Sequence, residues 1–88
     1  MSKRENDSKR NAISLTSLRS GETGAVAYTV GGYGLVRRLA EMGLTPGAKI
    51  KVLRKGPFHG PLQVEVRGVA LALGRGVASR VFVQPLRD

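Results

Sequence analysis

The sequence predicts a small, mainly β protein: a strongly bent barrel of about five short strands, with one short α-helix between the first and second strands. Apolar and polar residues alternate along several short segments, as they do in strands that bury one face. Twelve glycines among 88 residues provide the corners that a closing sheet requires. One segment, Arg37 to Gly47, combines a short helix, its stop signal and a tight turn.

The first predicted strand covers residues 25–30, where Val26, Tyr28 and Val30 alternate with smaller or polar residues. This alternation places Tyr28 in the core. The glycines of GGYG, residues 31–34, then give the chain room to turn into the helix. A phosphate-binding loop would occupy the same place, but the spacing of a dinucleotide fingerprint and the Gly-Lys-Ser/Thr of a P-loop are both missing.

The predicted helix has one apolar and one charged face. The apolar face is formed by Leu35, Val36, Leu39 and Met42, and the charged face by Arg37, Arg38 and Glu41. A helix of about two turns does not persist alone in water, so we expect Leu39 and Met42 to be buried against the barrel.

The helix is expected to end at Gly43, which adopts a left-handed conformation at little cost. Leu44 is placed to fold back on the last turn, as in a Schellman motif. Residues 45–48 then predict a type II turn, because Pro46 fixes φ at its second position and Gly47 accepts the positive φ of its third.

The rest of the chain predicts a hairpin and a closing strand. A tight turn at Arg67 and Gly68 interrupts two alternating segments and predicts the hairpin. Phe82 is expected in the core. The predicted strands are residues 49–55, with one mainly basic face, then 62–66, 69–73 and 81–83, and residues 74–79 are expected to form one helical turn.

The chain is strongly basic and contains no cysteine. Residues 1–12 hold four basic and two acidic side chains and little to bury, which predicts a disordered basic tail. Residues 13–88 still carry eleven Lys and Arg against four Asp and Glu, so an acidic partner surface is favoured. No apolar run approaches the ~20 residues of a transmembrane helix, and no leader pattern follows the charged start, so we expect a cytoplasmic protein.

Side chains for catalysis or firm metal binding are scarce. His59 is the sole histidine and has no second imidazole or carboxylate at ligand or triad spacing. The glutamates at 22, 41 and 65 are spread along the chain. We therefore expect no enzymatic activity and no cofactor, with His59 as a weak candidate for binding a divalent metal, iron or zinc.

Several segments together resemble the FeoA family of ferrous iron transport proteins. They are Leu15, Leu18 and Gly21 ahead of the first strand, then RRLAEMGLTPG, GPLQVEVRG and VALALGRGVASRVFV, in this order over about residues 14 to 84. The resemblance implies an SH3-like barrel in residues 13–88. It also implies a role beside FeoB, a membrane transporter whose cytosolic part carries a GTPase domain.

FeoA-like domains are also the C-terminal module of iron-dependent repressors of the DtxR type. This chain has no winged-helix or metal-binding half, which favours a separate partner protein over a repressor. The expected function is therefore a non-catalytic accessory protein that binds the cytosolic part of FeoB at the inner membrane face and modulates its assembly or activity, with weak homo-oligomerisation left open.

SH3-like barrels bind partners through loops and strand edges, which selects a first set of candidate contacts. These residues are Tyr33, Arg37, Arg38, Phe58 and His59. Three structural alternatives stay open: Tyr33 caps the helix entry, Phe58 folds back on the barrel, and the two arginines form a solvated helix face.

The runner-up function is a basic barrel that binds nucleic acid. Its support is the net charge and the basic strand formed by Lys49, Lys51, Arg54 and Lys55. Against it, the chain has four Tyr and Phe residues in total, and with two of them in the core little is left to stack on bases.

Overall fold

The computed structural model of the chain describes residues 11–86. Its strands are β1 (Ile13–Ser14), β2 (Thr23–Thr29), β3 (Lys49–Lys55), β4 (Leu62–Val66), β5 (Val69–Leu73) and β6 (Val81–Leu86). Its helices are the 3₁₀ turn η1 (Leu15–Ser17), α2 (Tyr33–Glu41) and α3 (Arg75–Ala78). Apart from residues 11 and 12, the predicted tail lies outside the described residues.

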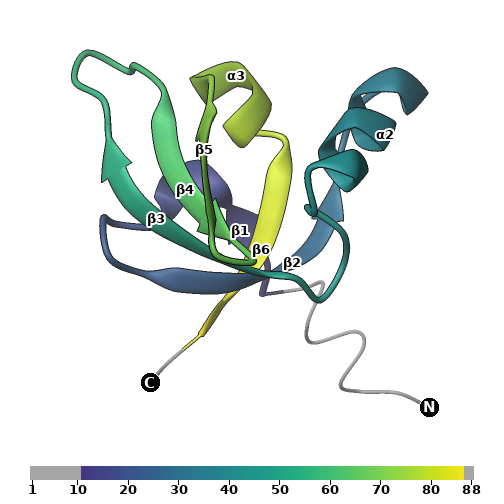
Figure 1. The fold of residues 1–88 in the computed structure, drawn as a ribbon, viewed down its shortest axis with the longest axis horizontal. Coiled ribbons are helices and arrows are strands. Elements are labelled where there is room, and N and C mark those ends of the chain that lie inside the picture. The colour runs from purple at the N-terminus through teal and green to yellow at the C-terminus, as the bar shows by residue number, and fades with distance from the viewer. Residues whose placement is uncertain (1–10, 87–88) are drawn as a thin grey trace.

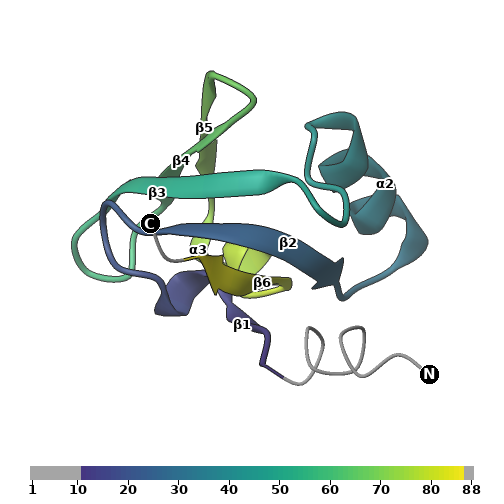
Figure 2. The same cartoon turned by 90° about the horizontal axis from the view of Figure 1, so that it is seen from below.

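The strands form one antiparallel sheet in the order β1-β6-β2-β3-β4-β5, which curls around a single core (Figures 1 and 2). The prediction of a small, mainly β barrel is confirmed, with α2 between β2 and β3 as expected. The sheet has six strands instead of about five, because the two-residue β1 pairs with β6, Ile13 opposite Val83. Two residues are too few to show an alternating pattern in the sequence.

The core is built from the inward positions of the strands, and η1, α2 and α3 each add one buried side chain. Its buried residues are Leu15, Leu18, Val26, Leu39, Leu44, Ile50, Val52, Leu62, Val64, Val66, Leu73, Ala78, Val81 and Val83. Apart from Gly24, no other residue of the described chain is fully buried. The helical turn predicted at residues 74–79 is confirmed by α3, whose Ala78 is fully buried.

The prediction that Tyr28 and Phe82 belong to the core is wrong. They lie opposite each other on β2 and β6 and stack with ring centroids 5.0 Å apart, half-buried and outside the core cluster. The register of β2 shifts between Val26 and Tyr28, so a β-bulge turns Tyr28 away from the face that Val26 uses. Phe82 alternates with two buried valines and therefore faces outward.

The predicted Schellman stop is confirmed at the end of α2. Gly43 has φ +94°, its N–H donates to the Ala40 carbonyl at 2.9 Å, and the Leu44 N–H donates to the Leu39 carbonyl at 2.9 Å. Leu39 and Leu44 are both buried. Met42, expected to be buried, is 36% exposed, because Leu39 and Leu44 occupy the barrel side of this turn and Met42 lies beyond the last helical residue.

Both predicted tight turns are also present. The Ala48 N–H donates to the Thr45 carbonyl at 3.0 Å and Gly47 has φ +91°, as the type II turn requires. In the β4–β5 hairpin, Arg67 and Gly68 have φ of +54° and +78°, the two positive values of a type I′ turn.

Replacing Arg67 by asparagine should stabilise the protein by about 0.5 to 1 kcal/mol, because asparagine tolerates the left-handed conformation better than arginine. The Arg67 side chain is exposed, so little packing is lost. Urea unfolding of the two proteins measures the change. A lower stability of Arg67→Asn would show that the arginine side chain makes a contribution larger than its backbone strain.

Candidate interaction surface

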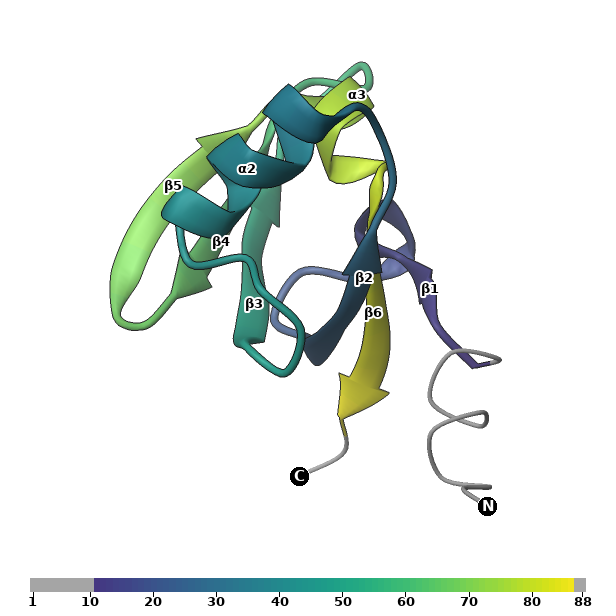
Figure 3. The same cartoon turned by 90° about the vertical axis from the view of Figure 1, so that its right-hand side faces the viewer.

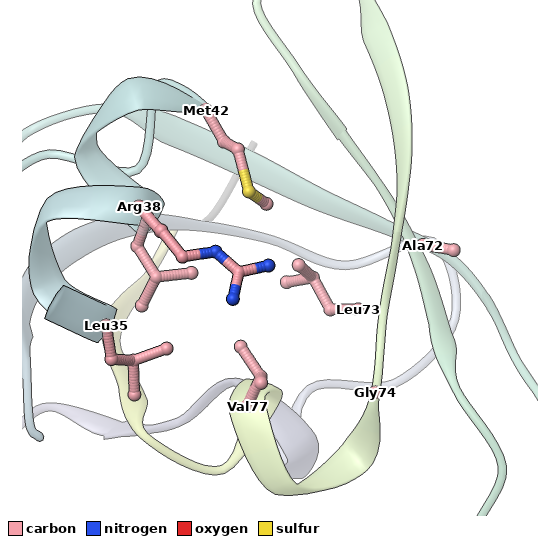
Figure 4. A pocket seen from close by; sticks show the side chains of 8 residues that line it. Leu35, Arg38, Met42, Ala72, Leu73, Gly74 and Val77 are labelled. Carbon is pink, nitrogen blue, oxygen red and sulfur yellow. The ribbon is translucent and has the colours of Figure 1, made fainter.

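The helix α2 carries three of the predicted contact residues. Tyr33, at the first turn, is 79% exposed, and the α2 N-cap is Gly32, which makes no side-chain capping bond. Arg37 is exposed and its Nε lies 3.5 Å from Glu41 Oε2, a solvated pair that contributes little to stability. Arg38, one residue along, turns toward the barrel (Figure 4).

The other two predicted contacts form the tip of the β3–β4 loop. The loop is closed by the Gly56 N–H donating to the Pro61 carbonyl at 2.8 Å and the Gly60 N–H donating to the Pro57 carbonyl at 3.0 Å. Between them, Phe58 and His59 have φ of +54° and +60°, a strained conformation for side chains of this size. Phe58 is 96% exposed, so it does not fold back on the barrel.

The five predicted residues do not form one continuous face. The β3–β4 loop and α2 lie on opposite sides of the molecule in Figures 1 and 2, with β5 and α3 between them in Figure 1. The sequence analysis grouped these residues as one set of candidate contacts, but the structure separates them into two regions.

A hollow lies between α2, the end of β5 and α3, and it holds about 170 Å³. Figure 3 shows how α2, β5 and α3 are arranged, and Figure 4 shows the residues that line the hollow from close by. The lining residues are Leu35, Arg38, Leu39, Met42, Ala72, Leu73, Gly74 and Val77. Sequence reasoning missed this hollow, because its walls come from two segments at least thirty positions apart in the chain.

The Arg38 guanidinium reaches into the middle of this hollow toward Leu73, with Leu35, Met42 and Val77 around it (Figure 4). Within residues 11–86 no carboxylate pairs with Arg38. Glu41, its nearest acidic neighbour along the helix, lies against Arg37 instead. The hollow is therefore apolar in its walls and cationic at its centre.

The predicted basic strand is only partly available as a surface. Lys49 and Lys51 are exposed on β3, but Lys55 is half-buried and its Nζ donates to the Thr16 carbonyl at 2.8 Å. A register shift between Val52 and Arg54 keeps Arg54 on the exposed side. The described part of the chain holds ten Lys and Arg against three Glu, so its surface remains strongly basic.

No group of three or more His, Cys, Asp or Glu side chains able to hold a metal ion occurs in residues 11–86. His59 stands exposed at the loop tip. None of the helices between residues 11 and 86 has the length and apolar character needed to cross a bilayer.

Comparison with known proteins identifies the family. A model of the FeoA domain matches residues 13–85. The chain belongs to the FeoA family. A FeoA relative from Methanocaldococcus jannaschii, provisionally named Fe(2+) transport protein A, is 34% identical over 70 residues, which are 80% of this chain and 83% of the relative.

Solved FeoA structures share the fold. The crystal structure of an iron uptake regulatory protein, FeoA, is 41% identical, with a TM-score of 0.79 over 85% of this chain and 99% of that chain. The zinc complex of Stenotrophomonas maltophilia FeoA, described as a prokaryotic SH3 domain protein, is 29% identical, with a TM-score of 0.73 over 86% and 98% of the two chains. Membership of the family places this chain in ferrous iron transport and confirms the SH3-like barrel.

Proposed function

We propose that this FeoA chain is a non-catalytic accessory protein in the cytoplasm that binds the cytosolic part of the ferrous iron transporter FeoB and modulates it. The family match over residues 13–85 carries the proposal. The Stenotrophomonas FeoA is described as a candidate activating factor of ferrous iron transport, which agrees with an accessory role. We include residues 13–88 in the binding domain.

Two surfaces of the described chain suit such a partner. α2 presents the exposed Tyr33 ring at its first turn and, further along the helix, Arg38 at the hollow, without a carboxylate partner in residues 11–86. The loop tip presents Phe58 with almost no contact to its own barrel. Exposed aromatic and arginine side chains are the types that dominate binding energy at protein interfaces.

Calorimetric titration of the full chain with the purified cytosolic part of the transporter tests the proposal. We expect saturable binding, and a loss of about tenfold or more in affinity for Tyr33→Ala or Phe58→Ala, whichever surface the transporter uses. Arg19→Gln, at an exposed arginine outside both surfaces, is the control, with a change below about threefold. The titration is run with and without guanine nucleotide, and absence of binding under both conditions contradicts the proposal.

Nucleic-acid binding is the second candidate, and one observation favours it beyond the net charge. The outward Tyr28–Phe82 pair lies on β2 and β6, and β2 pairs near its start with β3, which carries the exposed Lys49 and Lys51. The stack occupies one face of each ring, which reduces the area open to bases. Titration of single-stranded RNA at several salt concentrations discriminates, since real phosphate contacts give a steep, linear fall of log affinity with log salt.

A further inference from the structure

In the hollow beside α2, part of the apolar face of the helix is not packed against any other part of the described chain. α2 buries Leu39 alone completely, while Leu35 and Val36 stay half-buried and Met42 is exposed. The apolar face of the helix is therefore wider than the surface that the barrel covers. The uncovered part faces β5 and α3 across about 170 Å³, more than the ~150 Å³ of an apolar cavity that admits a benzene ring. One large aliphatic or aromatic side chain fits this space.

The charge at the centre of the hollow restricts what fills it. Arg38 is an exposed residue, so its guanidinium remains in contact with water and is open to a carboxylate that binds it at two nitrogens. Arg38 has no such partner within residues 11–86. A purely apolar occupant would remove this exposed cation from water without compensation, so the chemistry favours an apolar side chain accompanied by a carboxylate.

The edge of the sheet supplies a third contact beside the hollow. β5 ends the strand order, so its outer edge pairs with no strand in the described chain. Because the hairpin turn has two residues, Val66 and Val69 form a hydrogen-bonded pair, and the backbone groups of Ala70 and Ala72 point away from β4. Ala72 lines the hollow, so an open strand edge and the Arg38 cation adjoin each other.

We infer that this hollow is the docking site for an extended, acidic segment of a protein partner. The segment pairs with the β5 edge, places one apolar side chain between α2 and α3, and meets the Arg38 guanidinium with a carboxylate two residues away, since alternate side chains of a strand share a face. The inference rests on the proposed role as a partner-binding module and names the chemistry that the partner segment carries.

The probe is the peptide acetyl-Thr-Glu-Thr-Leu-Thr-Thr-amide, titrated into ¹⁵N-labelled protein and followed by amide NMR shifts. We expect weak, saturable binding with shifts at Leu35, Arg38, Ala72 and Val77. Changing the peptide Glu to Gln, or the protein by Arg38→Gln, should weaken binding about tenfold, as loss of a charge-assisted hydrogen bond does. Arg37→Gln, an adjacent arginine that faces away, should stay within about twofold.

Three results would overturn the inference. They are no shifts at millimolar peptide, equal losses of affinity for Arg37→Gln and Arg38→Gln, or shifts at the hollow that depend on protein concentration without peptide, which identify a second copy as the occupant.

A titration with the cytosolic part of the transporter separates this inference from the proposed function. If it binds Arg38→Gln with full affinity and does not displace the probe, the hollow is not the docking site, although the transporter remains the partner. If the probe binds but the transporter part does not, the hollow is confirmed and the proposed partner is wrong.

Discussion

Replacing Leu39 by alanine is expected to lower the free energy of unfolding by about 3 kcal/mol. Leu39 is 1% exposed and is the one residue that α2 buries completely. Truncating it removes the contact that holds the helix on the barrel and leaves a cavity next to the existing hollow. Urea unfolding followed by circular dichroism measures the loss.

Leu35→Ala is the matched control for this change, because Leu35 lies one turn earlier on the same face of α2 but is only half-buried. Its cost should be about 1 kcal/mol, since much less apolar area returns to water. Amide exchange adds a local readout: in Leu39→Ala the amides of α2 should exchange much faster than those of β3 and β4. Equal costs for the two variants would contradict the view that one side chain anchors the helix.

Replacing Gly43 by alanine is expected to cost about 2 kcal/mol. Gly43 has φ +94°, which a residue with a Cβ adopts only under strain, and that Cβ would lie 3.3 Å from Val66 Cγ1 in the core. The Schellman stop fixes the exit of α2 and the position of Leu44, so relaxation here disturbs buried packing. Chemical unfolding measures the change.

Gly47→Ala separates the two contributions, because Gly47 has nearly the same φ, +91°, but no atom within 4 Å of a new Cβ. This control should cost about 1 kcal/mol, the backbone strain alone. The difference between the variants then reports the packing against Val66. If Gly47→Ala proves at least as costly as Gly43→Ala, the account of the helix stop is wrong.

The parts of the fold that the sequence predicts are those encoded by neighbouring residues. The stop at Gly43, the turn through Gly47 and the hairpin at Arg67 and Gly68 each need a positive φ at a defined place, and each occurs where predicted. The strand positions follow from alternation as long as the register holds. Because alternation marks most of the strands, the sequence predicts a small barrel, although it does not give the exact number of strands.

The failures arise where distant segments decide the outcome. A bulge in β2 reverses the side of Tyr28, and nothing in the alternating sequence marks it. Met42 is exposed because Leu39 and Leu44 already fill the barrel side, which is a property of the packed structure. The strain at Phe58 and His59 depends on closure of the loop between Gly56 and Pro61.

The candidate site shows the same division. The sequence selected Tyr33 and Phe58 as candidate contacts from their helix-start and loop positions, but it left their exposure open and could not place them on opposite sides of the barrel. Arg38 looked equivalent to Arg37 in the sequence, as two charges on one helix. In the structure, Arg37 pairs with Glu41, whereas Arg38 points into the hollow. The difference arises because only part of the apolar face of α2 packs against the barrel.

The most direct test of the account is an amide NMR titration of the ¹⁵N-labelled full chain with the unlabelled cytosolic part of the transporter. The account predicts saturable line broadening or shifts that begin in α2, β5 and α3, and a weaker response in Arg38→Gln than in Arg37→Gln. A spectrum that stays unchanged at saturating concentrations of the transporter part, with and without guanine nucleotide, would contradict it.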